Sequence, residues 1–317
     1  MSGTDAIPEF PQRSAADGAD VSLTNMSAFT SGPGIRSLWE VAAIAAVAVL
    51  IIGGAEFLLR FFQVPHYVLP PPSAIFMALI TEFPHIAPHL GHTLVELLAG
   101  FAIGASIGLV MAAVITQIPF LEKIVAPYIL LLVTTPMLAL VPLLILRLGF
   151  GYEPRIVAVA LASGPMVMIN AATGFRRVDS AKIALARSYG ASTLQIFWKI
   201  RAPMALPMIL VGLMIGAIFG LLTAVGAEMV GGGFGLGNRL TTYSSMIQMP
   251  QFFAVVLILS ILGILIYMLF FLVGKIIGLF QKQTTKLVMT TELRQAISIL
   301  QYSTAELIDF LKEEALE

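Results

Sequence analysis

The sequence predicts an all-α protein that lies in a membrane, on two observations of composition and pattern. Hydrophobic residues make up 58% of the 317 positions and charged residues only 11%, and the mean hydropathy is +0.93. Soluble domains are about half apolar and about a quarter charged. The apolar residues also form runs that are too long for a water-soluble core, so we expect transmembrane helices.

The first part of the chain, residues 1–37, is expected to be a disordered tail. It is rich in Ser, Gly, Ala, Asp and Pro and contains no apolar run that could be buried. A cleavable signal peptide would need a basic start followed directly by an apolar stretch, and the early acids Asp5, Glu9, Asp17 and Asp20 contradict it. We therefore expect the tail to stay on the chain.

Residues 38–280 are expected to form a membrane domain with six transmembrane helices. Each segment has close to the ~20 residues that a helix needs to cross the hydrocarbon layer. The segments are 41–59, 93–115, 124–146, 156–173, 207–229 and 252–273.

The orientation of these helices follows from the loop cations. An even number of crossings puts both termini on one side of the membrane. If that side is the cytoplasm, the outer side holds only four of the 18 Lys and Arg residues, namely Arg60, Arg147, Arg155 and Arg239. Because Lys and Arg in loops favour the cytoplasmic side, both termini are predicted to be cytoplasmic.

Two of the predicted crossings carry a glycine at every fourth position. The glycines are Gly100, Gly104 and Gly108 in the second crossing, and Gly212, Gly216 and Gly220 in the fifth. Such stripes let helix backbones approach closely. We expect them to pack helices within the chain and to have no direct role in transport.

The third crossing is the predicted lining of a solute pathway. It contains three prolines, Pro127, Pro136 and Pro142, which leave carbonyls that must find other partners or face a wet cavity. A merely kinked structural helix is the alternative. The predicted pathway residues are Thr134, Thr135, Pro136 and Ala139, with Glu228 from the outer end of the fifth crossing. For Glu228 a structural hydrogen bond is the favoured alternative, because it lies near the interface.

No metal site is expected. The chain has no cysteine, and the histidines with helix-like spacing are His85, His89 and His92. Pro88 is expected to disturb a helix here, and the nearby acids are only Glu82 and Glu96.

The inner loop over residues 174–206 is the most basic stretch of the chain and reads GFRRVDSAKIALARSYGASTLQIFWKIRAPMAL. It predicts a first helix over 180–189, an interruption at Gly190, and a second helix capped by Ser192 or Thr193. The second helix is expected to run to about Ile200 and to end at Pro203 and Pro207. On physical grounds the loop is either a basic amphipathic element on the lipid surface or a docking surface for a cytoplasmic protein.

The spacing of Ala186, Gly190, Ile200 and Pro203 resembles the EAA loop of ABC importer permeases, in which two short helices insert into a cleft on the cytoplasmic ATPase. Other stretches look like the nitrate/sulfonate/taurine subfamily. They are VLPPPSAI at 68–75, LLAGFAIGASIGL at 97–109, TTPMLALVPLLILRLGFG at 134–151 and AVGAEMVGGGFGLG at 224–237. The resemblance covers about residues 69–273.

This resemblance implies the fold of a type I ABC importer permease with six transmembrane helices. It also implies a permease of the bacterial inner membrane that forms the pathway for nitrate, a sulfonate, taurine or a similar small solute. The implied ATPase-coupling residues are Ala184, Leu185, Ala186, Gly190, Ala191, Ile200 and Pro203. The implied partners are a cytoplasmic ABC ATPase dimer, an extracytoplasmic solute-binding protein, and a second permease copy in a homodimer.

Three positions depart from the resembled pattern. Ala184 stands where the family usually has Glu, Leu185 stands where Ala is typical, and Glu96 stands where Arg is common. The chain also has no GxxxxGK[ST] loop that could cradle the phosphates of a nucleotide. We therefore expect no enzyme activity in this chain, and ATP and Mg bound by the partner ATPase.

The C-terminal segment, residues 281–317, predicts a helical hairpin. Leu293, Ile297 and Leu300 form one apolar stripe, and Ser303 with Glu306 forms a capping box that starts a second helix. The segment resembles the N-terminal region of the nitrogen-regulation type sigma factor. A fused or misassembled reading frame is the favoured interpretation, and a regulatory appendage and a coincidental similarity are the alternatives. No nucleic-acid partner is expected.

An ion-coupled secondary transporter is the alternative function. Such a protein would use intramembrane acids or bases and often shows inverted repeats. The sequence pattern predicts no group of deep ionisable residues and no convincing repeat, so the ABC importer is favoured. A membrane enzyme is disfavoured because no cluster of His, Asp or Ser lies at one depth.

Overall fold

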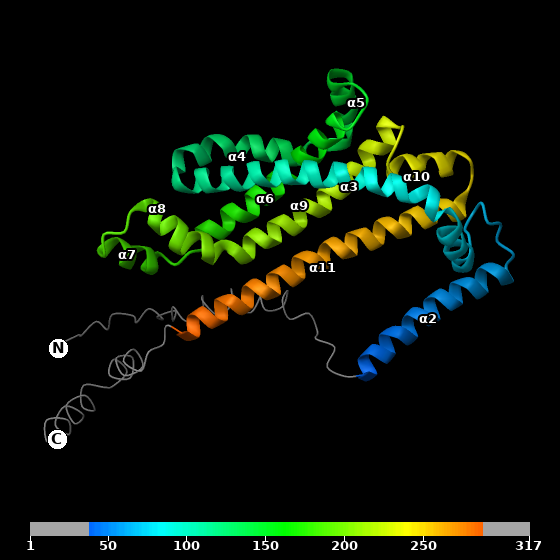
Figure 1. The fold of residues 1–317 in the computed structure, drawn as a ribbon, viewed down its shortest axis with the longest axis horizontal. Helices are drawn as coiled ribbons and strands as arrows, with labels where there is room; N and C mark the ends of the chain where they lie inside the picture. Colours follow the sequence, from blue (N-terminus) through cyan, green and yellow to red (C-terminus); the bar gives the residue numbers. More distant parts are fainter. Residues whose placement is uncertain (1–37, 288–317) are drawn as a thin grey trace, which may run out of the picture. The chain divides into compact units, whose positions relative to one another are not determined.

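The computed structural model describes residues 38–287, and within this range all regular secondary structure is helical (Figure 1). The helices are α2 (Leu38–Phe61), α3 (Pro72–Gln117), α4 (Pro119–Thr134), α5 (Met137–Leu148), α6 (Glu153–Arg176), α7 (Ser180–Ser188), α8 (Thr193–Ile196), the π-helical segment η1 (Phe197–Arg201), α9 (Ala202–Gly231), α10 (Leu236–Ser245) and α11 (Met249–Leu287). The predicted all-α class is confirmed.

Five of these helical segments are long and apolar enough to span a membrane, and the α4–α5 pair makes a sixth span if it is counted as one. Helix α2 belongs to a separate compact unit that ends at Val64, so we describe it alone. Its apolar window has a mean hydropathy of 2.4 and none of it is buried. These features fit a helix that is surrounded by lipid.

Helix α6 is the centre of the unit that begins at Pro65, because it makes the most extensive helix contacts, with α3 on one side and α9 on the other. Helix α11 packs against α3 and α9, and α5 packs against α6 and α9. Ala112, Phe175 and Ile209 meet in one apolar cluster, which joins α3, α6 and α9 near the α7–α8 end.

Both glycine stripes lie against α6. A Cβ atom on Gly104 would lie 2.5 Å from the carbonyl oxygen of Ala160, and one on Gly212 would lie 2.8 Å from the Cβ of Asn170. The other stripe glycines, Gly100, Gly108, Gly216 and Gly220, also face α6 residues at close range. Backbone-to-backbone packing of this kind requires residues without side chains.

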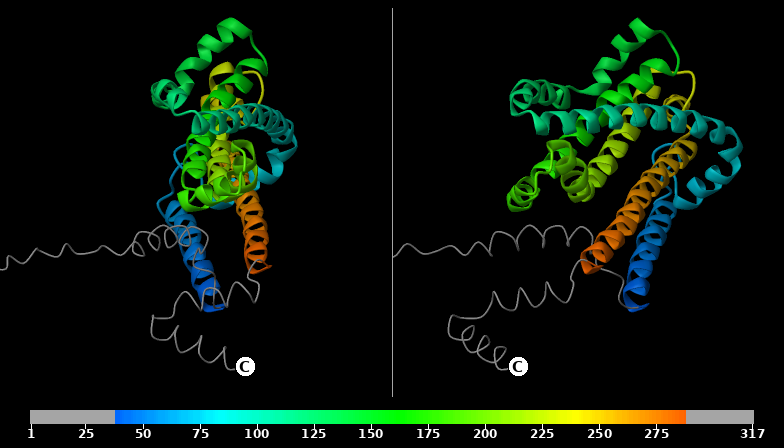
Figure 2. Two further views of the ribbon diagram at one scale, coloured as in Figure 1. Left: turned by 90° about the vertical axis from the view of Figure 1, so that its left-hand side faces the viewer. Right: turned by 60° about the vertical axis from the view of Figure 1, so that its left-hand side comes forward.

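Helix α3 continues through both of its prolines, contrary to the expected disturbance at Pro88. It runs for 46 residues with Pro84 and Pro88 inside it. A proline removes one backbone hydrogen bond and bends a helix, but the flanking bonds can keep the helix intact. Figure 2 shows α3, drawn in cyan, as a curved helix.

The expected third crossing is not one kinked helix but two helices with a bend of 94° between them. The break lies at Thr135 and Pro136, which both have extended backbone conformations. A proline disfavours helical geometry in the residue before it and has no N–H to donate. Pro127 and Pro142 lie inside α4 and α5 without breaking them.

The inner loop forms a short helix, a glycine turn and a second short helix that merges into α9. Asp179 caps α7 by accepting from the Ala181 N–H at 2.9 Å. Gly190 follows with a φ of +76°, and Ser192 forms a capping box with Gln195 at the start of α8.

The predicted end of the second short helix at Pro203 and Pro207 is wrong. The chain stays helical from Thr193 to Gly231. The wide π turn, in which the Ala202 N–H donates to the Phe197 carbonyl, lets the helix pass from α8 into α9 just before Pro203.

Two predicted segments lie mainly outside the described residues, namely the tail over 1–37 and most of the hairpin over 281–317. Helix α11 continues to Leu287, seven residues beyond the predicted end of the membrane domain at 280.

Candidate functional site

A pocket of about 360 Å³ lies at the break between α4 and α5. Its lining comes from α4, α5, α6 and α9. The lining residues are Leu132, Val133, Thr134, Thr135, Pro136, Met137, Leu138, Leu161, Ala162, Pro165, Met166, Phe219, Leu222 and Thr223. The structure therefore brings Thr134, Thr135 and Pro136 into one cavity, whereas Ala139 and Glu228 lie elsewhere.

The polar groups at this pocket are hydroxyls and backbone. None of the described residues that line it is ionisable. The Thr135 hydroxyl donates to the Leu131 carbonyl at 2.7 Å, so its oxygen can still accept. Pro136 cannot donate to the Leu132 carbonyl, and the first N–H groups of α5 have no partners within the helix. Such a site can replace part of the hydration of a small polar solute.

Helix α5 links this pocket to the end of α9. A side chain on Gly226 would collide with Leu138, which also lines the pocket. Farther along α5, Val141 is fully buried against Ala158 of α6 and Ala227 of α9.

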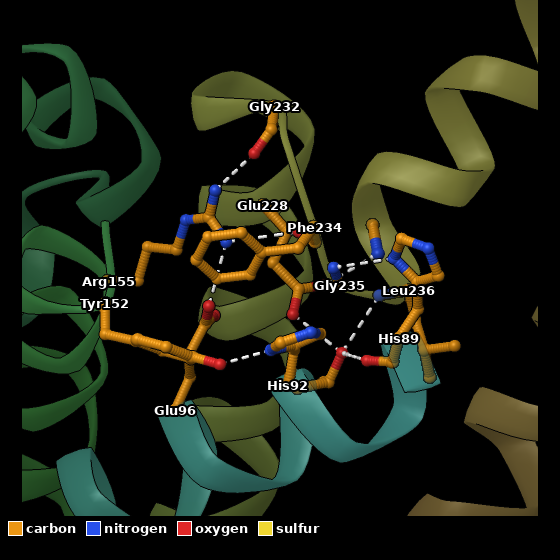
Figure 3. Close-up of polar contacts among 12 residues, drawn as sticks. His89, His92, Glu96, Tyr152, Arg155, Glu228, Gly232, Phe234, Gly235 and Leu236 are labelled. Carbon is orange, nitrogen blue, oxygen red and sulfur yellow. Dashed lines mark hydrogen bonds and ion pairs between the residues drawn. The ribbon is translucent and has the colours of Figure 1, made fainter. Parts of the chain in front are cut away.

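A buried polar cluster lies at the α10 end of the same helices (Figure 3). Arg155 is 3% exposed, and Thr93, Glu96 and Glu228 are fully buried. The Arg155 guanidinium donates to Glu96 Oε1 at 2.8 Å and to the Phe234 carbonyl at 3.1 Å. It also donates to the Gly232 carbonyl.

This cluster overturns two sequence expectations. Arg155 was expected in an outer loop, but α6 begins at Glu153 and encloses it. Deep ionisable residues were expected to be lacking, yet two carboxyl groups and a guanidinium are buried together. Glu96, which departs from the resembled pattern, is matched by Arg155. The signal was present in the sequence, since two acids in apolar helices require a positive partner.

Glu228, in the last turn of α9, binds Thr93 of α3 and the first turn of α10. Its Oε1 accepts from the Thr93 hydroxyl and its Oε2 accepts from the Gly237 N–H, both at 2.6 Å. The Thr93 oxygen in turn accepts from the Leu236 N–H at 2.9 Å. Glu228 thus lies in this hydrogen-bond network and not in the pocket.

Two of the three histidines contact the segment Gly232–Gly235 between α9 and α10. His89 Nδ1 accepts from the Gly235 N–H at 3.1 Å, and His92 is hydrogen-bonded to the Tyr152 hydroxyl. His85 is exposed. Among residues 38–287, no group of three or more His, Cys, Asp or Glu is placed to hold a metal ion.

Phe234 lies among three planar groups. Its ring centroid is 4.8 Å from those of His92 and Tyr152, and 4.2 Å from the guanidinium carbon of Arg155. This geometry is that of a cation–π contact with two aromatic neighbours.

Helix α10 anchors the far end of the segment. Leu236, Leu240 and Tyr243 are buried in a cluster with Ile86 and Val255. Burial raises the pKa of the Tyr243 phenol above its ordinary value, and the Glu82 carboxylate adds to this shift. The phenol therefore stays protonated and donates to Glu82 at 3.4 Å.

The coupling residues expected from the resemblance lie around the α7–α8 turn. A pocket of about 450 Å³ is lined by Ala186, Tyr189, Gly190, Ala191, Gln195, Ile196, Lys199 and Ile200. It brings four of the expected residues together, whereas Ala184, Leu185 and Pro203 lie outside it. Large exposed side chains surround it, and these are Leu185, Tyr189, Leu194 and Trp198. The two aromatic residues were not predicted as part of the coupling surface, although both lie within the predicted helices.

The chain is similar in sequence to permease proteins of ABC transporters. The chain is 30% identical over 203 residues to a probable ABC transporter permease protein of Haemophilus influenzae, covering 64% of this chain and 83% of that protein. It is 30% identical to the taurine transport system permease protein TauC of Escherichia coli, with coverages of 62% and 74%. It is also 30% identical to the putative aliphatic sulfonates transport permease protein SsuC of Bacillus subtilis, with coverages of 76% and 87%.

Solved structures show the same fold at lower identity. The inward-facing MetNI methionine ABC transporter matches with a TM-score of 0.50 at 21% identity, covering 60% of this chain and 92% of that chain. An amino acid ABC transporter solved with histidines matches with a TM-score of 0.52 at 21% identity, with coverages of 66% and 98%.

Two family models match the chain. The model of the sigma-54 factor activator interacting domain matches residues 278–317, which confirms the resemblance at the C-terminal end. The model of the binding-protein-dependent transport system inner membrane component matches residues 104–279, more than half of the 317 residues. The chain belongs to this family of inner-membrane permease subunits of ABC transporters, whose ATPase activity lies in a partner subunit.

Proposed function

We propose that solute crosses the membrane through the pocket at the α4–α5 break, in a homodimer of this permease. The observation that carries this proposal is the pocket itself, which combines a helix break, threonine hydroxyls and unpaired backbone groups midway along α6. Lipid could not satisfy such a break, so it must face protein or a wet pathway.

The solute class that fits best is a small polar organic solute with a sulfonate group, such as an alkanesulfonate or the zwitterion taurine. The N-terminus of α5 begins at the pocket, and helix N-termini favour negative charge. Two relatives of this chain are permeases for taurine and for aliphatic sulfonates. A pocket without ionisable residues holds such a solute weakly, which suits a passage whose selectivity resides in a separate binding protein.

The ATPase partner is proposed to dock at the α7–α8 turn on the cytoplasmic side. The exposed Leu185, Tyr189 and Trp198 offer an apolar surface beside the basic Lys182 and Lys199. With Ala184 in place of the family's Glu, docking would rely on shape and apolar contact. The loop cations favour this end as the cytoplasmic end and the α10 end as the outer end.

Uptake by proteoliposomes tests the proposal against ion-coupled transport. The permease is reconstituted with its ATPase and binding protein, and uptake of labelled taurine, ethanesulfonate and nitrate is measured. We expect uptake of at least one solute that requires both partners and internal ATP and that persists when ionophores collapse all ion gradients. Uptake that needs a gradient but no ATP would contradict the proposal.

A further inference from the structure

The segment Gly232–Gly235 between α9 and α10 is shaped by side chains from other helices. Its three glycines have positive φ values of 63°, 85° and 98°, a geometry that other residues rarely adopt. Inside the segment the structure records one backbone hydrogen bond, from the Phe234 N–H to the Gly232 carbonyl at 3.1 Å. At its ends the segment is joined to α9, by the Gly232 N–H donating to the Glu228 carbonyl, and to α10, by the Arg239 N–H donating to the Gly235 carbonyl. The side chains that contact it include His89 and His92 of α3 and Arg155 of α6, so its conformation depends on these helices as well.

Arg155 supplies the central contact. Its buried guanidinium donates one hydrogen bond to Glu96 and two to the carbonyls of Gly232 and Phe234. Its face also covers the Phe234 ring at 4.2 Å (Figure 3). Moving the segment away would leave a buried charge without these acceptors, which is costly. These contacts therefore favour the position that the segment has in the structure.

Arg155 also lies close to the point where the end of α9 packs against α5, the helix that begins at the pocket. A Cβ atom on Gly231 would lie 3.3 Å from Arg155 Nε and 3.5 Å from Ile145 Cδ1. Ile145 is near the end of α5, and the other end of α5 carries Leu138, which lines the pocket. Arg155, α5 and the end of α9 thus lie close together at Gly231, and α5 connects this point to the pocket.

We propose that Gly232–Gly235 is an outer latch on the solute pathway, with Phe234 as the side chain that closes it and Arg155 as the positioning residue that holds it closed. This proposal rests on the proposed function of the pocket. Docking of the solute-loaded binding protein at the outer end releases Phe234 from His92, Tyr152 and Arg155. Helix α5 then loses its support at Gly231 and shifts relative to α9, which opens the pocket outward.

A reversible cross-link tests whether Phe234 must move. The chain has no cysteine, so a Tyr152→Cys, Phe234→Cys pair can be joined by a short reducible bis-methanethiosulfonate reagent. In the resting, ATP-free transporter the pair should cross-link completely. Uptake should then be lost relative to the same double-cysteine protein before cross-linking, and it should return on reduction. Each single-cysteine variant should show the same uptake before and after the treatment. Either failure to cross-link or normal uptake by the cross-linked protein overturns the proposal.

The role of Arg155 has a separate readout. In a Phe234→Cys background, Arg155→Met should speed labelling by a membrane-impermeant thiol reagent in the absence of binding protein, and Arg155→Lys should have a smaller effect. Arg147→Met, at an exposed arginine of α5, is the matched control and should leave the labelling rate unchanged. An unchanged rate in an Arg155→Met protein of normal size-exclusion profile would contradict the assignment. Normal wild-type uptake in the same liposomes would leave the proposed function standing.

Discussion

Gly190 has a structural requirement that can be read at the scale of one residue. The sequence predicted an interruption there, and the structure gives it a φ of +76°. A Cβ atom at this position would meet nothing within 4 Å, so the constraint is on backbone conformation and not on space. Sequence could predict this turn because glycine between two helix-forming stretches has few other uses.

Arg155 shows where prediction from sequence fails at the same scale. Its partners are distant along the chain, since Glu96 and Phe234 are 59 and 79 residues away. Orientation rules assign a cation at a helix end to the loop, because they count charge and ignore tertiary pairing. Only the packing of α6 against α3 brings the guanidinium beneath its carboxylate.

Replacing Gly190 tests the coupling turn. Gly190→Val should strain the turn by about 1–3 kcal/mol and reduce ATP-driven uptake, because a β-branched residue rarely adopts a positive φ. Gly190→Asn should retain more uptake, since Asn tolerates this conformation. Uptake per assembled transporter is the measurement, with Gly91→Val as the control at an open helical site. Equal uptake for the Val and Asn variants would contradict this account of the turn.

Among the helices, the prolines differ in whether they interrupt a helix, and the sequence alone did not show which of them would. The chain places Pro84 and Pro88 in α3, Pro127 in α4 and Pro142 in α5 without a break, whereas α4 ends just before Pro136. Two β-branched threonines precede Pro136, and their hydroxyls bond to the carbonyls of Leu130 and Leu131. Such bonds bend helices and add to the effect of proline. The number of prolines alone could not reveal this difference.

The packing of α3 on α6 gives a prediction for an element. Gly104→Val should destabilise the folded permease and lower its yield, because even a Cβ atom would lie 2.5 Å from the Ala160 carbonyl. Overpacking of a tight contact costs about 1–3 kcal/mol or more. The midpoint of thermal unfolding in detergent is the measurement, and Gly91→Val on the same helix is the control. Equal midpoints for the two variants would show that α3 and α6 do not pack as described.

For the whole molecule, hydropathy was enough to predict the fold class and the apolar segments. The apolar windows and the family motifs depend on local sequence, which is why they could be read directly. The polar cluster depends on three helices meeting, and the pocket depends on a 94° bend. The sequence therefore indicated Thr134, Thr135 and Pro136 but not the helix arrangement that forms the pocket or pairs the buried charges.

The C-terminal segment that follows α11 is not expected to be needed for insertion or uptake. Its family match begins at residue 278, whereas α11 continues to Leu287. We expect truncation after Leu287 to leave expression and uptake near those of the full chain, because the membrane family match already ends at residue 279. Membrane-fraction immunoblots and uptake of the two chains would check this expectation. A loss of insertion or of uptake would show that the segment is an integral part of the permease.

Thiol accessibility along the α4–α5 break tests most directly whether solute passes through the pocket there. Single cysteines are placed at each position from 132 to 146 and at Thr223, with Ile107→Cys on the exposed face of α3 as a control. We predict that a water-soluble reagent labels positions 134–138 and Thr223, that labelling weakens beyond Ala139, and that ATP with binding protein changes the pattern. Uniform protection of all these positions would contradict a solute pathway at the break.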